Sequence, residues 1–569
     1  MYKQVLNPVS HSLGWSALVA CLPLLVLFVL LGAVKTRAWI ASLVSLALAL
    51  VIAIAVYSMP VGQALLAGSE GAAFGFFPIL WIVINAVWIY KMTVETGHFD
   101  VLGRSFSGIS DDMRVQAVII TFCFGALLEA LAGFGTPVAI TSVMLVALGF
   151  EPLKAASLAL VANTAPVAFG ALAIPITTLS KVTSIPVDDL GKMVGRQTPV
   201  LAVFVPFALV FIADGRRGLR QTWPVALVGG LVFGIAQFVT SNYISVVLAD
   251  VVAALLAAAA IVALVRVWRP AGEAGAGRSS VRARPLPVAG GAVDEPPVRS
   301  VGRLEAGQAG RDPRSEVIRA YAPYLIIIAV FVLSSLSFIK GTEPAKPGKS
   351  GSGINAVTQV VNWPGLHVVS SSGKALSSIP FKLNYLAAAG TLLLISGLLT
   401  MIVLRVGVGR ALRAYVATLR QLSTAIVTVM AVLALAFVMN DSGQTVTIGK
   451  WMAGAGGVFA LLSPMLGWLG TAVTGSDTSS NSLFGVLQVQ AAADAHLNPL
   501  LLAAGNSSGG VLGKMVSPQN LAIGASVVGL ADQEGVLFRR VIGWSLGFLV
   551  FMALLVYLQS TSVLSWMIP

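Results

Sequence analysis

The segment Glu129-Ala-Leu-Ala-Gly-Phe-Gly-Thr-Pro-Val-Ala-Ile140 interrupts an apolar run that extends from Val115 to Phe150. The run is longer than the roughly 20 residues that one membrane-spanning helix needs. Within it, Gly133-Phe-Gly-Thr-Pro137 combines two glycines and a proline, which cannot continue a helix. We therefore expect a helix, an irregular tip at 133–137 and a second helix, which together make a re-entrant hairpin inside a membrane.

The same kind of interruption recurs along the chain. The next apolar run, 153–179, contains Asn163-Thr-Ala-Pro166 and a further proline at Pro175, so we expect a discontinuous helix there. A second hairpin tip is predicted at 474–481 and a second broken helix at 498–530, with its break at Gly505–Gly510. Backbone that leaves the helix at membrane depth is typical of transporters, where it lines the ligand site.

The composition supports a membrane protein. Of the 569 residues, 57% are hydrophobic and only 10% are charged, and the mean hydropathy is +0.89. The apolar runs do not alternate with a period of two, so we predict an all-α polytopic membrane protein. The net charge of +13 falls in loops beside predicted spans, as the positive-inside rule expects, and does not indicate nucleic acid. The scattered histidines form no metal-binding pattern and no phosphate-binding loop is present, so we expect no cofactor.

The predicted spans and loops divide the chain into successive parts. These are an N-terminal span (1–37), a first repeat (38–213), two linking spans (214–265), a basic cytoplasmic loop (266–319), a span with a polar outer insert (320–380), a second repeat (381–556) and a C-terminal end (557–569). Lysines and arginines next to the spans place the basic loop in the cytoplasm, and alternation of the spans then places the insert outside.

The two repeats are recognised when the chain is compared with itself at an offset of about 343 residues. This comparison superposes Asn163 on Asn506, Gly170 on Gly513 and Pro175 on Pro518. The first repeat begins on the cytoplasmic side and the second begins outside, so we expect inverted-topology repeats. In transporters built this way, the site lies near the midplane where the repeats meet.

Small polar residues gather at the predicted tips and breaks. A helix that begins at such a break presents free N–H groups and the positive end of its dipole, which favour a carboxylate. We therefore expect an anionic substrate, bound by residues of both repeats: Gly133, Gly135, Thr136, Asn163, Thr164, Ser476, Thr478, Ser479, Asn506, Ser507, Ser508 and Lys514. Small polar residues also permit close helix packing, which is the alternative for each of them.

Ionisable groups inside spans cost about 2.5 to 3.5 kcal/mol each at a helix centre, so function is their first explanation. Glu129 precedes the first tip, Asp477 lies in the second tip, and Lys514 follows the second predicted break. Burial favours the neutral form of a carboxyl, so we expect Glu129 or Asp477 to carry a proton. Lys514 is expected to pair with the substrate carboxylate or with Asp477. The alternatives are hydrogen bonds to hairpin backbone for the acids and snorkelling to an interface for the lysine.

Several segments resemble signature stretches of the bacterial L-lactate permease family. They are Glu129 to Ile140, Asn163-Thr-Ala-Pro-Val-Ala-Phe-Gly170, Met193-Val-Gly-Arg-Gln197, Thr474-Gly-Ser-Asp-Thr-Ser-Ser-Asn481, Gly513-Lys-Met-Val-Ser-Pro-Gln519 and Trp566-Met-Ile-Pro569. The resemblance spans nearly the whole chain and implies a lactate–proton symporter of the bacterial plasma (inner) membrane, with D-lactate and glycolate as further substrates. Ala130, where family members often have glycine, and the long basic loop depart from the family pattern.

Other functions stay open at this point. A carrier of gluconate or of a dicarboxylate would use the same fold, although a dicarboxylate requires a second cation beside Lys514. A membrane-embedded enzyme could use Glu129, Asp477 and Asn506 as catalytic groups, yet it would not require paired broken helices. A channel would show neither saturation nor accumulation against a gradient. The sequence leaves the oligomeric state and the choice between proton and sodium open.

Overall fold

The structure is a computed structural model that describes residues 1–569 except 35, 108, 132, 134, 269, 271–311, 343, 345–346, 374–375, 377–379 and 531–532. Most of the predicted basic loop 266–319 therefore lies outside the described residues. Within the described chain, ten helices are long and apolar enough to cross a membrane, or eleven if one bent pair is counted as a span. The prediction of an all-helical, multi-pass membrane protein is confirmed.

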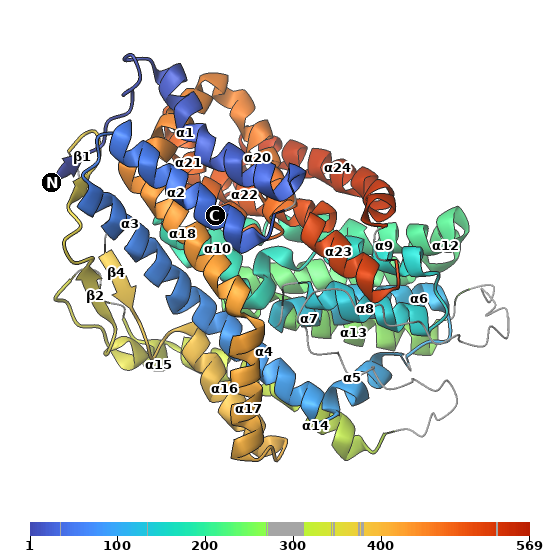
Figure 1. Ribbon diagram of the computed structural model, residues 1–569. Helices are drawn as coiled ribbons and strands as arrows, with labels where there is room; N and C mark the ends of the chain where they lie inside the picture. The colour runs from blue at the N-terminus through green and yellow to red at the C-terminus, as the bar shows by residue number, and fades with distance from the viewer. Residues whose placement is uncertain are drawn as a thin grey trace.

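The first half of the chain is almost entirely helical (Figure 1). Its elements in order are β1 (Tyr2–Lys3), α1 (Leu13–Phe28), η1 (Val29–Ala33), α2 (Ala38–Ala55), α3 (Val61–Phe74), η2 (Gly75–Leu80), α4 (Trp81–Glu95), α5 (His98–Ser107), α6 (Met113–Ala117), η3 (Val118–Phe124), α7 (Gly125–Leu131), α8 (Thr136–Ala147), α9 (Pro152–Ala162), η4 (Val167–Phe169), α10 (Gly170–Thr183), α11 (Val187–Val194), α12 (Thr198–Val239), η5 (Thr240–Ile244), η6 (Val246–Leu248) and α13 (Ala249–Val267).

The second half adds a small insert with strands to a further set of helices. Its elements are α14 (Arg314–Ser335), α15 (Ser337–Lys340), η7 (Gly353–Asn355), β2 (Gln359–Asn362), β3 (Val368–Val369), β4 (Pro380–Leu383), α16 (Ala389–Val403), α17 (Val408–Gln421), α18 (Ser423–Ser442), α19 (Gln444–Met452), η8 (Ala453–Val458), α20 (Phe459–Thr474), α21 (Asp477–Asp494), α22 (Pro499–Gly513), η9 (Lys514–Val516), α23 (Pro518–Val527), α24 (Glu534–Gln559) and η10 (Ser565–Met567).

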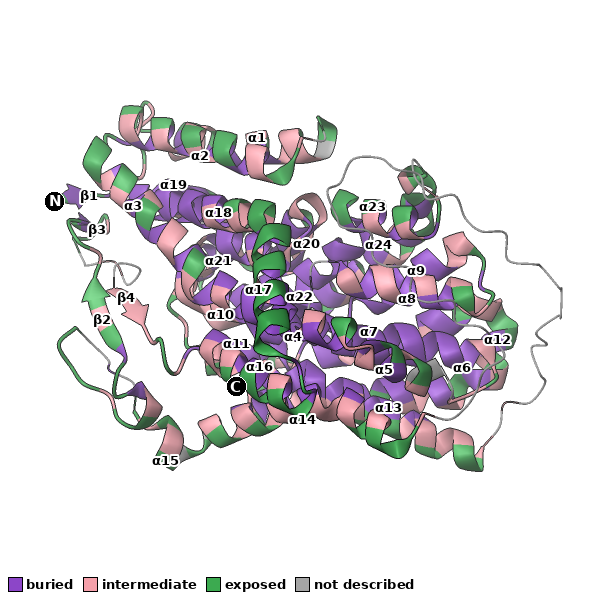
Figure 2. Ribbon diagram, turned by 60° about the horizontal axis from the view of Figure 1, so that its bottom comes forward, coloured by how far each residue is buried: buried purple, intermediate pink, exposed green. Residues whose placement is uncertain are grey.

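The helices form two groups with α10 and α22 between them. Figure 1 shows α2, α3 and α18 side by side on one side of the molecule, and α7, α8, α9, α12 and α13 gathered on the other. Figure 2 shows α10 and α22 as mostly buried, whereas α14 and α17 lie at the surface. The second half of the first broken helix (α10) and the first half of the second (α22) thus lie in the interior.

The N-terminus is attached to the insert, which the sequence did not predict to contain strands. β1 pairs in parallel with β3, and β2 pairs antiparallel with β4. The Tyr2 hydroxyl donates to the carbonyl oxygens of Tyr57 at 2.8 Å and Ser442 at 3.0 Å. The first residues of the chain therefore cover the end of α18.

The second predicted break lies elsewhere in the structure. The segment Gly505–Gly510, predicted as a break, lies inside the continuous helix α22, and the chain leaves the α-helix only at Lys514. The reason is close packing on α20. A Cβ atom at Gly509 would collide with the carbonyl oxygen of Pro464. Small residues at this face let the two helices approach closely, so here they serve packing and do not end the helix.

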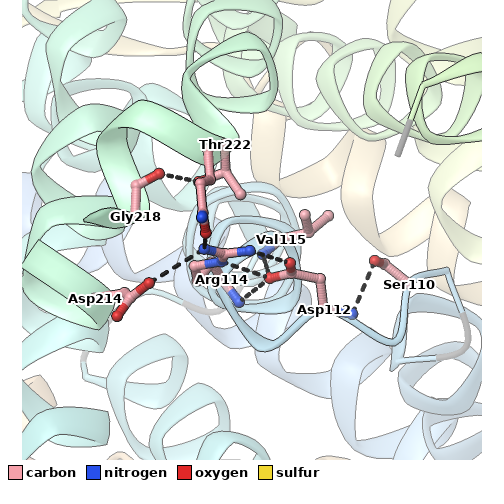
Figure 3. A network of polar contacts seen from close by, with 8 residues as sticks. Ser110, Asp112, Arg114, Val115, Asp214, Gly218 and Thr222 are labelled. Atoms are coloured by element: carbon pink, nitrogen blue, oxygen red, sulfur yellow. Dashed lines mark hydrogen bonds and ion pairs between the residues drawn. The ribbon is translucent and has the colours of Figure 1, made fainter. Parts of the chain in front are cut away.

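A buried arginine ties the base of the first hairpin to a bend in α12. Arg114 is 2% exposed. Its Nη2 lies 2.6 Å from Oδ2 of Asp112 and its Nη1 lies 3.2 Å from Oδ2 of Asp214 (Figure 3). Its Nη1 also donates to the side chain of Gln221. Helix α12 bends at Asp214, Gly215 and Thr222, so the network fixes the hairpin to this bend.

We expect Arg114→Met to destabilise the fold by about 1 to 3 kcal/mol, because it removes the hydrogen-bonded cation of two partly buried carboxylates, those of Asp112 and Asp214. The matched control is Arg104→Met. Arg104 pairs with Asp312 at 3.0 Å, but its side chain is 41% exposed, and such surface pairs contribute only about 0 to 1 kcal/mol. Thermal unfolding of the purified variants in detergent checks the difference. Equal losses for the two variants would contradict the structural role of Arg114.

Candidate functional site

Both hairpin tips are built in the same way. Gly135 (φ 83°) immediately precedes α8, and Gly475 (φ 77°) ends α20 just before α21. A left-handed backbone suits glycine and lets the chain reverse within the hairpin. Both tips pack on α23, since a Cβ atom at Gly135 would collide with Ile523 and one at Gly475 would lie 2.5 Å from Oε1 of Gln519. One short helix therefore contacts both tips.

The first broken helix consists of α9 and α10, which meet at an angle of 64°. Asn163, Thr164 and their neighbours form the turn between them. Three successive residues at the start of α10, Ala171–Ala173, have φ between 43° and 60°. A left-handed turn of non-glycine residues costs roughly 1 to 2 kcal/mol per residue. This strained segment directly follows the break.

Glu129 and Lys514 form an ion pair between the two halves of the chain. The Nζ of Lys514 lies 2.5 Å from Oε1 of Glu129, and both side chains are buried. A Cβ atom at Gly170 would lie 2.8 Å from the same carboxyl oxygen, so the start of α10 lies against the pair. The structure thus differs from the expectation that Lys514 pairs with Asp477.

Asp477 is held in a different network, made by residues of the second repeat. Its Oδ2 accepts from Ser507 Oγ at 2.7 Å and from Asn481 Nδ2 at 3.3 Å. Asn506 donates to Asn481 at 2.9 Å and accepts from Gln488 at 3.0 Å. These side chains use one another as partners, which is the arrangement expected of a structural network.

The other predicted residues of the second repeat are also engaged within the protein. Ser508 donates to Oε1 of Gln197 at 2.7 Å. Ser476 caps α21 by accepting from the backbone N–H of Ser479. Thr478, like Thr136 at the first tip, is half-buried at the start of its helix.

Several polar atoms around the first break are buried without a partner among the described residues. Asn163 is 4% exposed and Thr164 is 1% exposed. Both amide atoms of Asn163, the hydroxyl of Thr164 and Oε2 of Glu129 have no hydrogen-bond partner among the described residues. An unpaired buried polar group is costly, and such groups commonly mark the place of a ligand. Of the predicted binding residues, Asn163 and Thr164 are those with buried side-chain atoms that lack a partner among the described residues.

Asp250 was not predicted and belongs to the same region. It is 1% exposed, and its Oδ1 accepts from Gln237 Nε2 at 2.7 Å. The same Gln237 nitrogen lies 3.4 Å from the carbonyl oxygen of Ala165 in the break. Oδ2 of Asp250 has no partner among the described residues, and its charge acts on that of Glu129. The sequence feature that could have identified Asp250 is an acidic residue near the start of the apolar run 245–265.

A large surface hollow lies away from these residues. It has a volume of about 480 Å³ and lies between α12 and α24, with Phe204, Trp544 and Phe551 in its lining. Its lining is apolar, so it offers nothing to bind a carboxylate. The polar breaks are the better candidate site.

Comparisons by sequence identify permeases as relatives of this chain. The sequence pattern of the L-lactate permease family matches residues 16–563. An L-lactate permease of Bacillus subtilis (strain 168) is 38% identical over 583 residues, which cover 100% of both chains. The glycolate permease GlcA of Escherichia coli (strain K12) is 40% identical over 560 residues, 96% of each chain. Among solved structures, MtrF of Neisseria gonorrhoeae aligns over 86% of this chain and 82% of its own chain at 13% identity, with a TM-score of 0.44.

Proposed function

The chain belongs to the L-lactate permease family, and from this premise we propose that it carries L-lactate and related 2-hydroxy monocarboxylates, D-lactate and glycolate among them, together with a proton. It is a multi-pass protein of the bacterial plasma membrane. Members of a permease family move their substrate without converting it, so we set the membrane-enzyme alternative aside.

The observation that carries the proposal is the set of unpaired polar atoms at the break between α9 and α10, a junction that packs on the elements that carry the buried Glu129–Lys514 ion pair. Lys514 supplies a positive charge for the substrate carboxylate. Asn163 and Thr164 supply donors and acceptors for the hydroxyl group on the neighbouring carbon. A small 2-hydroxy acid has groups of both kinds on adjacent carbons. We propose that the other predicted residues of both tips shape the site, with those of the second repeat held by their own network.

Charge balance supports coupling to a proton. Lys514 carries one positive charge, and Glu129 neutralises it in the ion pair. A substrate carboxylate on Lys514 leaves the site with one uncompensated negative charge in a low dielectric. A proton on Glu129 removes this charge. The same proton cancels the cost of moving an anion into the cell, about 2.3 kcal/mol per 100 mV.

We propose Glu129 as the proton carrier, with Asp477 as the alternative to it, and we add Asp250 as a further carboxyl of the site. We also propose that residues 38–213 and 381–556 are inverted repeats that meet at this site. The basic loop then lies in the cytoplasm and the insert 340–382 outside. This arrangement would place the site near the midplane.

The test is uptake of labelled L-lactate into proteoliposomes that hold the purified protein, with an imposed inward proton gradient and no sodium. We expect accumulation that a protonophore abolishes. Uptake of gluconate or a dicarboxylate in place of lactate would show that the proposed substrate is wrong and would leave the description of the fold unchanged. Flux that neither saturates nor accumulates lactate would indicate a channel.

Asn163 and Asn506 occupy matching positions in the two repeats. Replacing each of them by alanine should separate residues that bind substrate from residues that stabilise the fold. Asn163→Ala is expected to raise the KM for lactate about 10- to 100-fold with little change in melting temperature, because the Asn163 amide has no partner among the described residues to lose. Asn506→Ala should instead destabilise the protein by about 1 to 3 kcal/mol, since it removes an acceptor of Gln488 Nε2 and the donor to Oδ1 of the buried Asn481. Uptake kinetics and thermal unfolding of both variants check this. The reverse pattern would move the binding site to the second repeat.

A further inference from the structure

The apolar hollow between α12 and α24 continues into a smaller hollow that has a charged side chain in its lining. The larger hollow, of about 480 Å³, is lined by aromatic side chains of both helices. The smaller one, of about 220 Å³, is lined by Ser157 of α9, Arg540 of α24 and three apolar residues. Phe211 and Trp544 line both hollows. The two therefore form one groove, with an apolar arm and a basic end.

Ring contacts show that α12 and α24 run antiparallel along this groove. The centroids of the Phe204 and Phe551 rings lie 5.4 Å apart, and those of the Phe211 and Trp544 rings lie 6.0 Å apart. The contact thus moves forward along α12 as it moves back along α24. Continued in this direction, it brings the bend of α12 to the start of α24, where Arg540 lies. The bend and Arg540 are therefore at the same end of the groove.

Positive charge gathers at this basic end. The bend of α12 and the start of α24 carry exposed arginines, which are Arg216, Arg217, Arg220, Arg539 and Arg540. Lys154 in the first turn of α9 adds a further cation, whose Nζ donates to a backbone carbonyl oxygen next to the bend at 3.1 Å. Asp214 in the bend already pairs with Arg114. Glu151 and Glu534, at the starts of α9 and α24, are fewer than these cations. Among the described residues, the basic end therefore carries a net positive charge.

Arg540 lines the groove without a partner among the described residues. Its side chain is exposed and makes no hydrogen bond or ion pair with them. The hydroxyl of Ser157, the other polar side chain of the lining, already donates to the carbonyl oxygen of Leu153 at 2.7 Å. A guanidinium binds phosphate through two parallel N–H groups. The basic end of the groove therefore suits a phosphate group.

We propose that this groove binds an anionic phospholipid, with its phosphate on Arg540 and an acyl chain along the aromatic rings of α12 and α24. A phospholipid carries its charge and its apolar chain in the order in which the groove offers partners for them. A soluble phosphate ester would leave the apolar arm uncovered. Tryptophan is enriched at the level of the lipid head groups, which is where Trp544 lies in this arrangement. Basic pockets between membrane helices bind anionic head groups in membrane proteins.

Helix α9 connects this groove to the first helix break. It packs on both α12 and α24, and it ends at Asn163. Ser157 of the same helix is part of the lining of the basic end. A lipid in the groove therefore contacts the first half of the broken helix.

The test is native mass spectrometry of the purified full-length protein with two lipids of identical acyl chains, phosphatidylglycerol and phosphatidylcholine. We expect the Kd for phosphatidylglycerol to be at least about tenfold lower, because its head group lacks the cation of phosphatidylcholine. Arg540→Gln should reduce this preference at least about fivefold. Arg413→Gln, the matched control, removes an exposed arginine of α17 and should leave the preference unchanged. Phe548→Ala should weaken the binding of both lipids equally, since both use the apolar arm.

Equal affinity of the wild-type protein for the two lipids would show that the proposal is wrong, a result that needs no variant to fold. A full preference in an Arg540→Gln variant of unchanged melting temperature would show that the anionic lipid binds elsewhere. Displacement of phosphatidylglycerol by an equal concentration of glycerol phosphate would mean that the groove binds a soluble phosphate ester instead. A dimer that binds neither lipid would mean that a second copy of the chain covers the groove. The measurement involves no transport substrate, so failure of lactate uptake would overturn the proposed function alone.

Discussion

Replacing Lys514 with methionine is expected to lower the kcat/KM of L-lactate uptake at least about 30-fold. Truncating one partner of a buried charge pair between two binding partners costs about 2 to 5 kcal/mol of binding free energy, and each 1.4 kcal/mol corresponds to a factor of ten. Within the described part of the site, Lys514 is the cation that contacts Glu129. Without it, neither Glu129 nor the substrate carboxylate has a positive partner. Initial rates of uptake over a range of lactate concentrations measure the loss.

Two controls separate this effect from general damage. Lys349→Met removes an exposed lysine of the insert and should leave uptake unchanged. The double variant Glu129→Gln with Lys514→Met should recover much of the lost thermal stability, since no unpaired charge remains, yet it should still fail to bind lactate. An unchanged KM in Lys514→Met would leave the lysine as a structural partner of Glu129 alone.

Glu129→Gln is expected to abolish accumulation of lactate while exchange of labelled for unlabelled lactate continues. The glutamine cannot carry a proton, so the substrate crosses with its own charge. At an interior potential of −100 mV, about 2.3 kcal/mol then opposes entry, and internal lactate should settle about 50-fold below external lactate. Accumulation at zero potential should be lost as well, because the pH gradient no longer contributes. Counterflow and uptake in the same vesicles measure the two quantities.

Asp477→Asn is the matched comparison for this result. Its oxygens already accept hydrogen bonds from Ser507 and Asn481, so we expect the variant to lose stability and to keep its coupling. Normal accumulation by Glu129→Gln together with uncoupling by Asp477→Asn would make Asp477 the proton carrier.

The first hairpin tip and the first helix break were predictable, because both depend on the backbone properties of residues at those positions. The glycines and prolines of the first tip exclude a continuous helix at that place, whatever surrounds them. The break at Asn163 is marked in the same way by Pro166. The second break was misplaced, because glycines such as Gly509 serve close packing as readily as they end a helix, and only the neighbouring helix α20 decides between the two.

Long-range partners could not be predicted. Glu129 and Lys514 are 385 residues apart, and periodicity in the sequence does not indicate which acid a lysine meets. The hydrogen-bonding state of the two matching asparagines could not be predicted either. Asn163 and Asn506 occupy the same position in the aligned repeats, yet Asn506 has partners and Asn163 has none among the described residues. Asp250 could have been selected as a candidate functional residue from the sequence, since it is an acid inside an apolar run.

The attachment of the N-terminus has a consequence for how the protein is made. Tyr2 contacts Ser442, which is 440 residues further along the chain. At a synthesis rate of about 5 to 20 residues per second, the first residues to leave the ribosome wait roughly 20 to 90 s for this partner. The start of the chain is therefore among the last parts to reach its final position. A chain that ends before residue 440 would insert its first spans and still leave its N-terminus unattached.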